Sequence, residues 1–247
     1  MKHSCAMIFV VTIFGFASAV DVSAQNVGGK PTKPAPVAVG RVCNAEKDFS
    51  GTQNPHQEWS YGSFESDSFA EFKLLSPSKR RTGNAKSSLR SNTTWKKIEG
   101  WFGMASAGDG NPSVIHCFDT GTSRVGTVTV PSNCLIMHPG PGGERSVVRY
   151  KATRRALFKV EGYFNALDAT TTDPHILVNG EEVVKIEPIN GKGQKREFSF
   201  SQVVDLSGTI DFVVGHGGNG FTCDATGFNV TITPLAPPAL IKPTGAR

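Results

Sequence analysis

Beyond its first residues, the 247-residue chain lacks any hydrophobic run long enough to cross a membrane. Its one apolar stretch, residues 6–16, is shorter than the roughly 20 residues that a spanning helix needs. Lys2 precedes this stretch, and two small-residue cleavage patterns, Ala17–Ala19 and Val22–Ala24, follow it. This order is typical of a secretory signal peptide, with an uncleaved anchor as the alternative. We expect residues 1–24 to be removed, leaving a periplasmic or secreted protein without a transmembrane segment.

Catalytic signatures are also missing. The sequence contains no G-x-S-x-G, no H-E-x-x-H, no P-loop and no G-x-G-x-x-G that opens a helix. The run 216–219 (HGGN) is similar to an oxyanion loop, but it joins two predicted strands and no nucleophile accompanies it. We therefore expect no enzymatic activity. A glycoside hydrolase is the less favoured alternative, and the loop acids that could form its carboxylate pair are Glu58, Glu65, Asp67, Asp168 and Asp173.

Helical periodicity is absent as well, and an alternation of period two takes its place. Within residues 209–214, the side chains of Ile210, Phe212 and Val214 point one way and those of the other three residues point the opposite way. Residues 228–233 alternate in the same manner. This pattern predicts antiparallel strands with one face on a core and one face in water.

Similar strand patterns recur back to about residue 110, separated by turn signals such as Asn179-Gly180, which is typical of a type I′ hairpin. The segment 95–104 fits a helical turn or a strand equally well. We predict an all-β fold, an antiparallel β-sandwich of the jelly-roll kind, over residues 41–235. A flexible Pro- and Gly-rich leader at 25–40 precedes it, and a disordered tail at 236–247 follows it.

The formal net charge of +5 is scattered over several short basic clusters rather than gathered in one patch. Such clusters could contact nucleic acid or acidic polymers. Export argues against nucleic acid, so we expect no nucleic-acid partner and regard these clusters as solvated loops.

Four cysteines remain after removal of the signal peptide: Cys43, Cys117, Cys134 and Cys223. An even number in an exported protein predicts two disulfide bonds. Cys117 and Cys134 bracket a short strand pair, so we pair them, and this leaves Cys43 with Cys223. Zinc is disfavoured because the spacings contain no C-x-x-C.

Aromatic residues near stiff loops are the best signal for a ligand. Trp59 and Tyr61 stand two apart on one predicted strand and share a face, where flat rings could cover the C–H faces of a sugar. His138 opens a Pro- and Gly-rich loop, and Asn219 lies in a glycine-rich one, so both could hydrogen-bond to hydroxyls. The alternative is that the two rings fill the sandwich core.

Two acids at the ends of the domain, Asp48 and Asp224, are candidates for a shared structural calcium ion. This prediction requires the first and last strands to be neighbours. Turn capping is the alternative, because no D-x-D-x-D-G motif is present.

Four blocks of sequence together resemble an uncharacterised family of exported bacterial jelly-roll modules, which is similar to carbohydrate-binding modules and often carries a PEP-type sorting signal. The blocks are 48–64 (DFSGTQNPHQEWSYGSF), 138–152 (HPGPGGERSVVRYKA), 175–180 (HILVNG) and 209–233 (TIDFVVGHGGNGFTCDATGFNVTIT). The resemblance covers residues 45–234 and implies an extracytoplasmic β-sandwich with no established activity. This chain lacks the C-terminal sorting helix of the family, which favours a free periplasmic or secreted protein.

These observations predict an exported, non-catalytic binding module for saccharide or polysaccharide. Trp59, Tyr61, His138 and Asn219 are its expected contact residues, and a saccharide or a cell-envelope polymer is its expected partner. The alternative is a structural or interaction protein of the cell envelope.

Overall fold

The computed structural model describes residues 37–65, 69–76, 98–103, 111–118, 122–125 and 127–236. All the described residues belong to one compact unit, Pro36–Arg247. These residues contain no helix, and so none that is long and apolar enough to cross a membrane. The predicted signal peptide (1–24), most of the leader and residues 237–247 of the tail lie outside the described residues.

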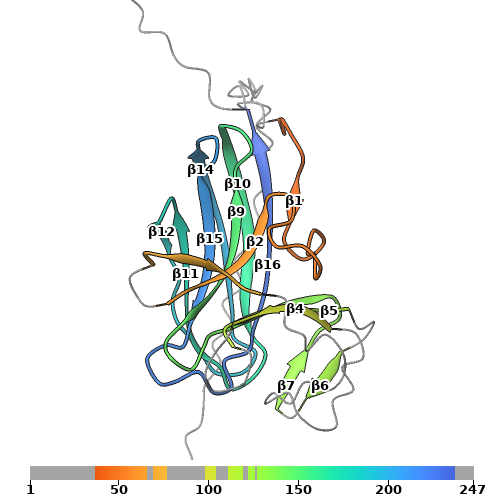
Figure 1. Ribbon diagram of the computed structural model, residues 1–247, viewed down its shortest axis with the longest axis vertical. Coiled ribbons are helices and arrows are strands. Elements are labelled where there is room, and N and C mark those ends of the chain that lie inside the picture. The colour runs from red at the N-terminus through yellow and green to blue at the C-terminus, as the bar shows by residue number, and fades with distance from the viewer. Residues whose placement is uncertain are drawn as a thin grey trace, which may run out of the picture. The chain divides into compact units, whose positions relative to one another are not determined.

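The described unit consists mainly of two seven-stranded antiparallel sheets, which confirms the all-β sandwich (Figure 1). The first sheet has the spatial order β14 (Lys195–Val204), β10 (Ala156–Ala166), β16 (Thr226–Leu235), β8 (Cys134–His138), β5 (Ser113–Cys117) and β4 (Ile98–Phe102), with β1 (Cys43–Asn44) also paired to β16. The second has the order β12 (Glu181–Lys185), β11 (Thr171–Val178), β15 (Thr209–Gly215), β9 (Arg145–Lys151), β2 (Trp59–Phe64) and β3 (Phe72–Leu74), with β13 (Ile189–Asn190) also paired to β11.

Alternating side chains from the two sheets form the main core between them. On β10 the buried side chains include Phe158, Val160 and Phe164, as the period of two predicts. The rings of Phe212 on β15 and Phe228 on β16 have centroids 5.2 Å apart, so aromatic contacts join the sheets across the core. Burial of these large apolar side chains is the main force that holds the sheets together.

Strand β15 differs from the prediction that one of its faces lies in water. Asp211 and Val213, on the face away from the main core, are both 0% exposed. Val213 belongs to a small second cluster, and the half-buried rings of Phe69 and Phe72 pack against that cluster. A period of two identifies the two faces of a strand, but it does not show that a distant segment folds over the outer one.

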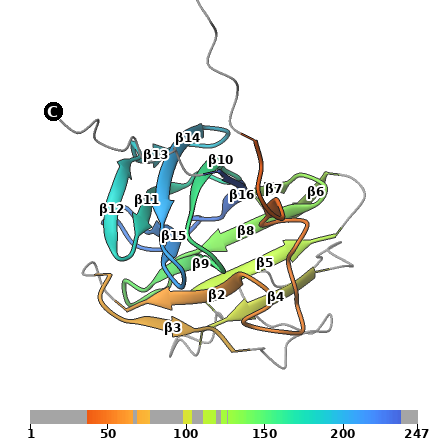
Figure 2. The same ribbon diagram turned by 90° about the horizontal axis from the view of Figure 1, so that it is seen from above.

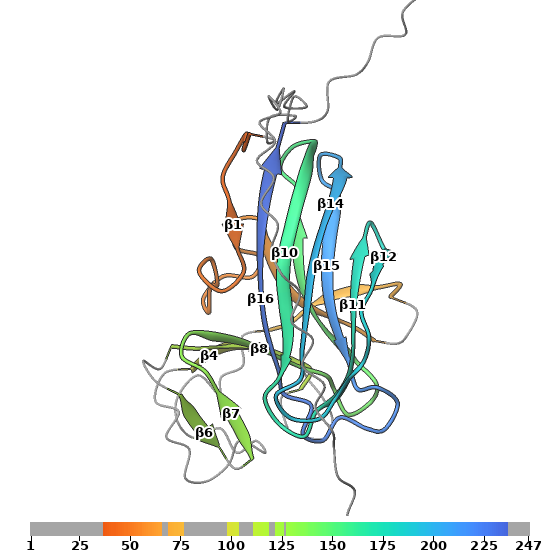
Figure 3. The same ribbon diagram turned by 180° about the vertical axis from the view of Figure 1, so that it is seen from behind.

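A third apolar cluster lies on the other side of the molecule, on the outer face of the first sheet. The hairpin of β6 (Ser123–Val125) and β7 (Val128–Val130) forms a separate two-stranded sheet beside β4 and β8 (Figure 3). Val130 contributes to this cluster with Cys117, Cys134 and Leu167.

Two local predictions are resolved by the structure. Asn179 and Gly180 both have positive φ, 52° and 85°, and connect β11 to β12, which confirms the type I′ hairpin. The undecided segment 95–104 contains strand β4, so its described part is extended rather than helical.

The sheet region begins slightly earlier than the predicted domain boundary at residue 41. The backbone N–H of Val39 donates to the carbonyl of Pro234 at 2.9 Å, and that of Ala236 donates to Val37 at 3.2 Å. Residues 37–39, placed in the leader by the sequence, therefore pair with the end of β16.

Candidate functional site

The two rings that the sequence places on a sugar-binding face lie in the core instead. Trp59 and Tyr61 are each 0% exposed. The Trp59 ring meets Tyr150 edge-on at 5.4 Å, and Tyr61 stacks parallel to Trp101 at 6.4 Å. Because neither ring reaches solvent, the prediction that they contact a ligand is wrong, and the alternative that they fill the core is correct.

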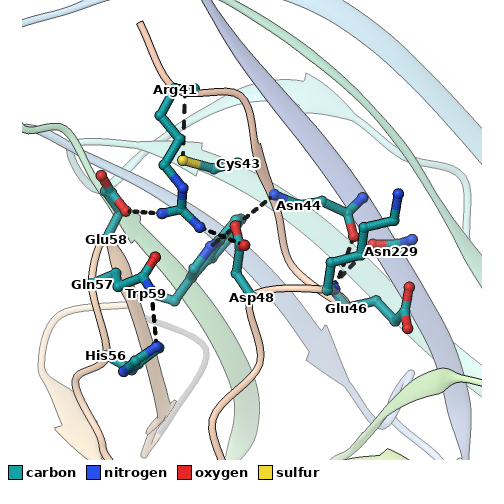
Figure 4. Close-up of polar contacts among 11 residues, drawn as sticks. Arg41, Cys43, Asn44, Glu46, Asp48, His56, Gln57, Glu58, Trp59 and Asn229 are labelled. Carbon is teal, nitrogen blue, oxygen red and sulfur yellow. Dashed lines mark hydrogen bonds and ion pairs between the residues drawn. The ribbon is translucent and has the colours of Figure 1, made fainter.

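Asp48 connects the N-terminal segment to this buried region (Figure 4). Its Oδ2 accepts hydrogen bonds from the backbone N–H of Asn44 at 2.9 Å and from the indole Nε1 of Trp59 at 3.3 Å. Its Oδ1 accepts one from Arg41, which also donates to Glu58 at 2.8 Å. Both oxygens of Asp48 therefore accept hydrogen bonds from protein donors, and these donor groups cannot serve as ligands of a cation.

Asp48 and Asp224 lie too far apart to share a calcium ion. Asn44, beside Asp48, pairs with Thr231 on β16, whereas Asp224 precedes the start of that strand at Thr226. Five residues of strand correspond to about 17 Å, and calcium ligands must lie within about 2.6 Å of the ion. The prediction of a shared site is wrong. Across the described ranges, no group of three or more His, Cys, Asp or Glu side chains could hold a metal ion.

The same separation rules out the predicted bond between Cys43 and Cys223. Cys43 is the register partner of Ile232 on β16, and Cys223 precedes Thr226 at the other end of that strand. A disulfide requires Cα atoms within about 7 Å, and the strand between these positions spans about 20 Å. The sequence correctly predicted that Cys43 lies beside the last strand, but it did not predict at which end.

Cys117 and Cys134 face each other in the register of β5 and β8, yet no disulfide joins the four described cysteines. The Cys134 thiol instead donates to the carbonyl of Leu135, with 3.2 Å between Sγ and the oxygen. Burial and the nearby Cys117 raise the pKa of Cys134 to about 12. A thiol that stays protonated at neutral pH is a poor nucleophile, so this pair acts as part of the apolar cluster.

Three connections meet at one end of the sandwich, the lower end in Figure 1, and we call this region the loop end. They are residues 139–144 between β8 and β9, 167–170 between β10 and β11, and 216–225 between β15 and β16. The second and third are joined by a 3.0 Å hydrogen bond from the Leu167 N–H to the Ala225 carbonyl. Two of the four predicted contact residues, His138 and Asn219, lie here.

His138 is the last residue of β8, at the edge of this region. Its Nδ1 lies 2.9 Å from the carbonyl oxygen of Pro139, and its ring meets Phe221 edge-on at 6.1 Å. Phe221 is half-buried in the glycine-rich loop. Sequence reasoning missed this ring, although an aromatic residue flanked by glycines in a loop was a usable signal.

Asp173, on β11, holds the glycine-rich loop through a hydrogen bond to its backbone. Its Oδ1 accepts a hydrogen bond from the Gly217 N–H at 2.9 Å, and its Oδ2 accepts one from Arg145 at 2.7 Å and lies 3.2 Å from His175 Nε2. Burial would raise the pKa of Asp173, but the bonds from His175, Gly217 and Arg145 outweigh it and hold that pKa well below its usual range. Burial lowers the pKa of His175, but the hydrogen bonds to Asp173 and Glu182 raise it by more, so that the pKa lies above its usual value.

The loop itself has a conformation that requires glycine. Gly217 has φ of 61°, and a Cβ there would collide with the Thr171 carbonyl oxygen. The Gly218 N–H donates to Nδ1 of His216 at 3.0 Å, so the neutral form of this imidazole carries its proton on Nε2. The imidazole and the loop backbone therefore hold each other in place.

Thr171 links the exposed amide of Asn219 to a buried acid. Its hydroxyl donates to Asn219 Oδ1 at 2.9 Å, and its backbone N–H donates to Asp224 Oδ1 at 2.9 Å. Asp224 is 0% exposed, and its Oδ2 has no hydrogen-bond partner among the described residues. Burial raises the pKa of Asp224 to about 6, more than the bonds to Thr171 lower it.

This arrangement suits binding better than bond cleavage. Asp173 is engaged by three hydrogen-bond donors and Asp224 is buried, so neither carboxylate is presented at the surface of the loop end. The other loop acids considered for hydrolysis are similarly held: Glu58 by Arg41, Glu65 by Lys73 and Asp168 by Thr127, whereas Asp67 lies outside the described residues. The surface offers a ring, an amide and an imidazole instead.

No protein-family model and no curated protein matches the chain. Among solved structures, it is similar to the carbohydrate-binding module CBM51 of Clostridium perfringens GH95 in complex with methyl-galactose, with 15% identity, 59% of this chain and 96% of that chain covered and a TM-score of 0.32. It is also similar to a family 35 carbohydrate-binding module of Clostridium thermocellum, with 12% identity, 55% and 89% covered and a TM-score of 0.28. A third likeness, to the M60 catalytic domain with two CBM51 domains of Clostridium perfringens ZmpB, has 18% identity, 59% and 15% covered and a TM-score of 0.35.

Proposed function

We propose that this protein is an exported, non-catalytic module that binds saccharide or polysaccharide through its loop end. The contact residues are His138, His216, Asn219 and Phe221. The observation that carries the proposal is a half-buried aromatic ring beside an exposed amide, both on a glycine-rich loop that is held in one conformation.

Each part of this surface matches a chemical feature of a sugar. The Phe221 ring offers a flat apolar face for the C–H side of a pyranose. Asn219 uses its Oδ1 to accept from Thr171, and within the described part of the chain its Nδ2 donates no hydrogen bond. This amide N–H₂ is therefore available to a hydroxyl oxygen of the ligand.

The rigidity of the loop favours binding because the loop loses little conformational freedom when a ligand binds. Gly217 is tied to Asp173, Gly218 to His216 and Asn219 to Thr171. Binding to a preformed loop avoids part of the entropy cost of ordering it. The predicted export places this surface where cell-envelope or extracellular polysaccharide is the natural partner.

The test is affinity-gel retardation and a glycan array with the parent protein and the variants Phe221→Ala and Asn219→Ala. We expect the parent to be retarded by at least one polysaccharide and each variant to lose most of that retardation. Tyr163→Ala is the matched control, because Tyr163 is a half-buried ring on β10 and is not part of the three connections that form the loop end.

Equal retardation of Phe221→Ala and the parent would contradict the proposal. Retardation that falls steeply with salt but survives both loop-end substitutions would instead favour a basic interaction protein of the cell envelope.

A further inference from the structure

A cleft lies on one side of the sandwich, between edge strands of the two sheets. Strand β3 belongs to the second sheet and β4 to the first, and they run along the same side of the molecule (Figure 2). Ser76, just beyond β3, pairs with Phe102 of β4 through hydrogen bonds of 3.1 and 3.3 Å. The cleft beside this bridge has a volume of about 260 Å³. Drug-sized ligands occupy pockets of roughly 300–1,000 Å³, so this cleft suits a ligand of about one sugar ring.

The lining of the cleft combines apolar and hydrogen-bonding groups. Its apolar residues include Leu74, which is 50% exposed, the half-buried ring of Phe102, and Pro112. Two residues that carry hydroxyls, Ser63 and Ser76, also line it. A pyranose has the same division between C–H faces and hydroxyl edges, which an apolar hydrocarbon or a fully charged ligand does not have.

The charge carried by the described lining residues is negative. The Lys73 ammonium is paired with the Glu65 carboxylate, so these two groups compensate each other. The third charged group of the described lining is Glu144, whose Oε2 accepts a hydrogen bond from the Gly142 N–H at 2.8 Å. Within the described ranges, no cation forms an ion pair with Glu144. An anionic sugar in the cleft would therefore meet an uncompensated carboxylate.

The cleft adjoins the loop end through a single connection. Glu144 belongs to the 139–144 connection, and a Cβ on the preceding Gly143 would lie 3.6 Å from Nε2 of His216. This imidazole belongs to the proposed contact surface. One stretch of chain thus contributes to both places.

We propose that the cleft is a second saccharide subsite that takes one neutral or amino sugar residue and disfavours uronic acids. The inference rests on the proposed saccharide-binding function and adds a specificity that the loop end does not supply. Glu144 is the residue that sets the charge preference, and Leu74 and Phe102 supply the apolar contact.

The experiment is an NMR titration of the purified protein with ¹³C-methyl-labelled leucine, using glucose, glucosamine, glucuronic acid and their galacto counterparts as probes. The Leu74 methyl signals should shift on titration. The dissociation constants of the uronic acids should be at least about threefold larger than those of the neutral and amino sugars. This factor is in the range that exposed charge pairs produce.

The variant Glu144→Gln removes the charge and keeps an oxygen that can accept from Gly142. It should bring uronic acids to the affinity of neutral sugars. The matched control is Glu161→Gln, on the exposed outer face of β10, and it should leave the preference unchanged. Leu74→Asn should weaken all six sugars alike, because Leu74 is exposed at an edge and is not needed for the core.

The inference is overturned if no sugar shifts the Leu74 signals, or if Glu144→Gln retains the discrimination of the parent. Failure of the proposed function gives a different result, in which the parent is not retarded by any polysaccharide or is retarded equally after Phe221→Ala. If the Leu74 methyl signals of the Phe221→Ala variant still shift when sugar is added, the cleft binds sugar through its own contacts.

Discussion

The two ends of β16 use the same kinds of residue in opposite ways. Near Ile232, the Trp59 ring is buried and both oxygens of Asp48 accept hydrogen bonds. Near Thr226, the Phe221 ring is half-exposed and one oxygen of the buried Asp224 has no partner among the described residues. The first end is therefore part of the packed core, whereas the second presents the Phe221 ring and the exposed Asn219 amide, which are groups that a ligand can reach.

The largest effect should follow from Trp59→Ala. Removal of this fully buried indole leaves a cavity and also leaves Asp48 without one of its donors. We expect the free energy of unfolding to fall by about 3–5 kcal/mol, measured by urea denaturation. A loss below about 1 kcal/mol would contradict the assignment of this end to the core.

The next effect concerns pH at the loop end. Burial raises the pKa of Asp224 from 3.8 to about 6. The folded state thus binds a proton more tightly than the unfolded state, and Asp224 makes stability fall as pH rises from about 4 to about 6. The difference of about two pKa units corresponds to at most about 3 kcal/mol. Asp224→Asn should remove this contribution, as measured by the difference in unfolding free energy between parent and variant from pH 4 to pH 8.

His116 contributes with the opposite sign over nearly the same pH range. Burial lowers its pKa from 6.5 to about 4, so stability is lost as pH falls from about 6.5 to about 4. His116 therefore opposes Asp224 in the parent, and Asp224→Asn should be more sensitive to acid than the parent. An unchanged profile in that variant would exclude a raised Asp224 pKa.

A smaller effect is expected for Asp48→Ala. This substitution leaves the Trp59 indole N–H and the Asn44 backbone N–H without their acceptor. We expect a loss of about 1–3 kcal/mol, seen as a lower urea midpoint. Sugar binding by the folded variant should equal that of the parent, because Asp48 is remote from the loop end.

The smallest effect on stability should come from Phe221→Ala. The ring is half-buried in a loop and contacts His138 only edge-on. We expect the unfolding free energy to change by less than about 1 kcal/mol, with the loss of polysaccharide retardation described above. A large loss of unfolding free energy would show that the Phe221 ring, like that of Trp59, stabilises the fold by packing in the core.

The contrast between Trp59 and Phe221 shows the limit of sequence reasoning here. Both are aromatic residues near turns, and both fit a sugar platform or a core. The alternation in 209–233 predicted β15 and β16 correctly, and Asn179-Gly180 predicted its hairpin, because these features depend on local backbone preferences. Burial of a ring depends instead on which distant strand covers it, and one sequence does not contain that information in any local pattern.

The sequence by itself determined the class of fold, since alternating side chains and turn residues act over a few positions and leave only stacked antiparallel sheets as a way to bury the apolar faces. Only the tertiary structure decided which ends of the strands meet. It placed Cys43 and Asp48 far from Cys223 and Asp224, and it gathered His138, Asn219 and Phe221 at the loop end. The physical reason is that strand pairing is set by side-chain packing between segments far apart in the chain, which no local preference encodes.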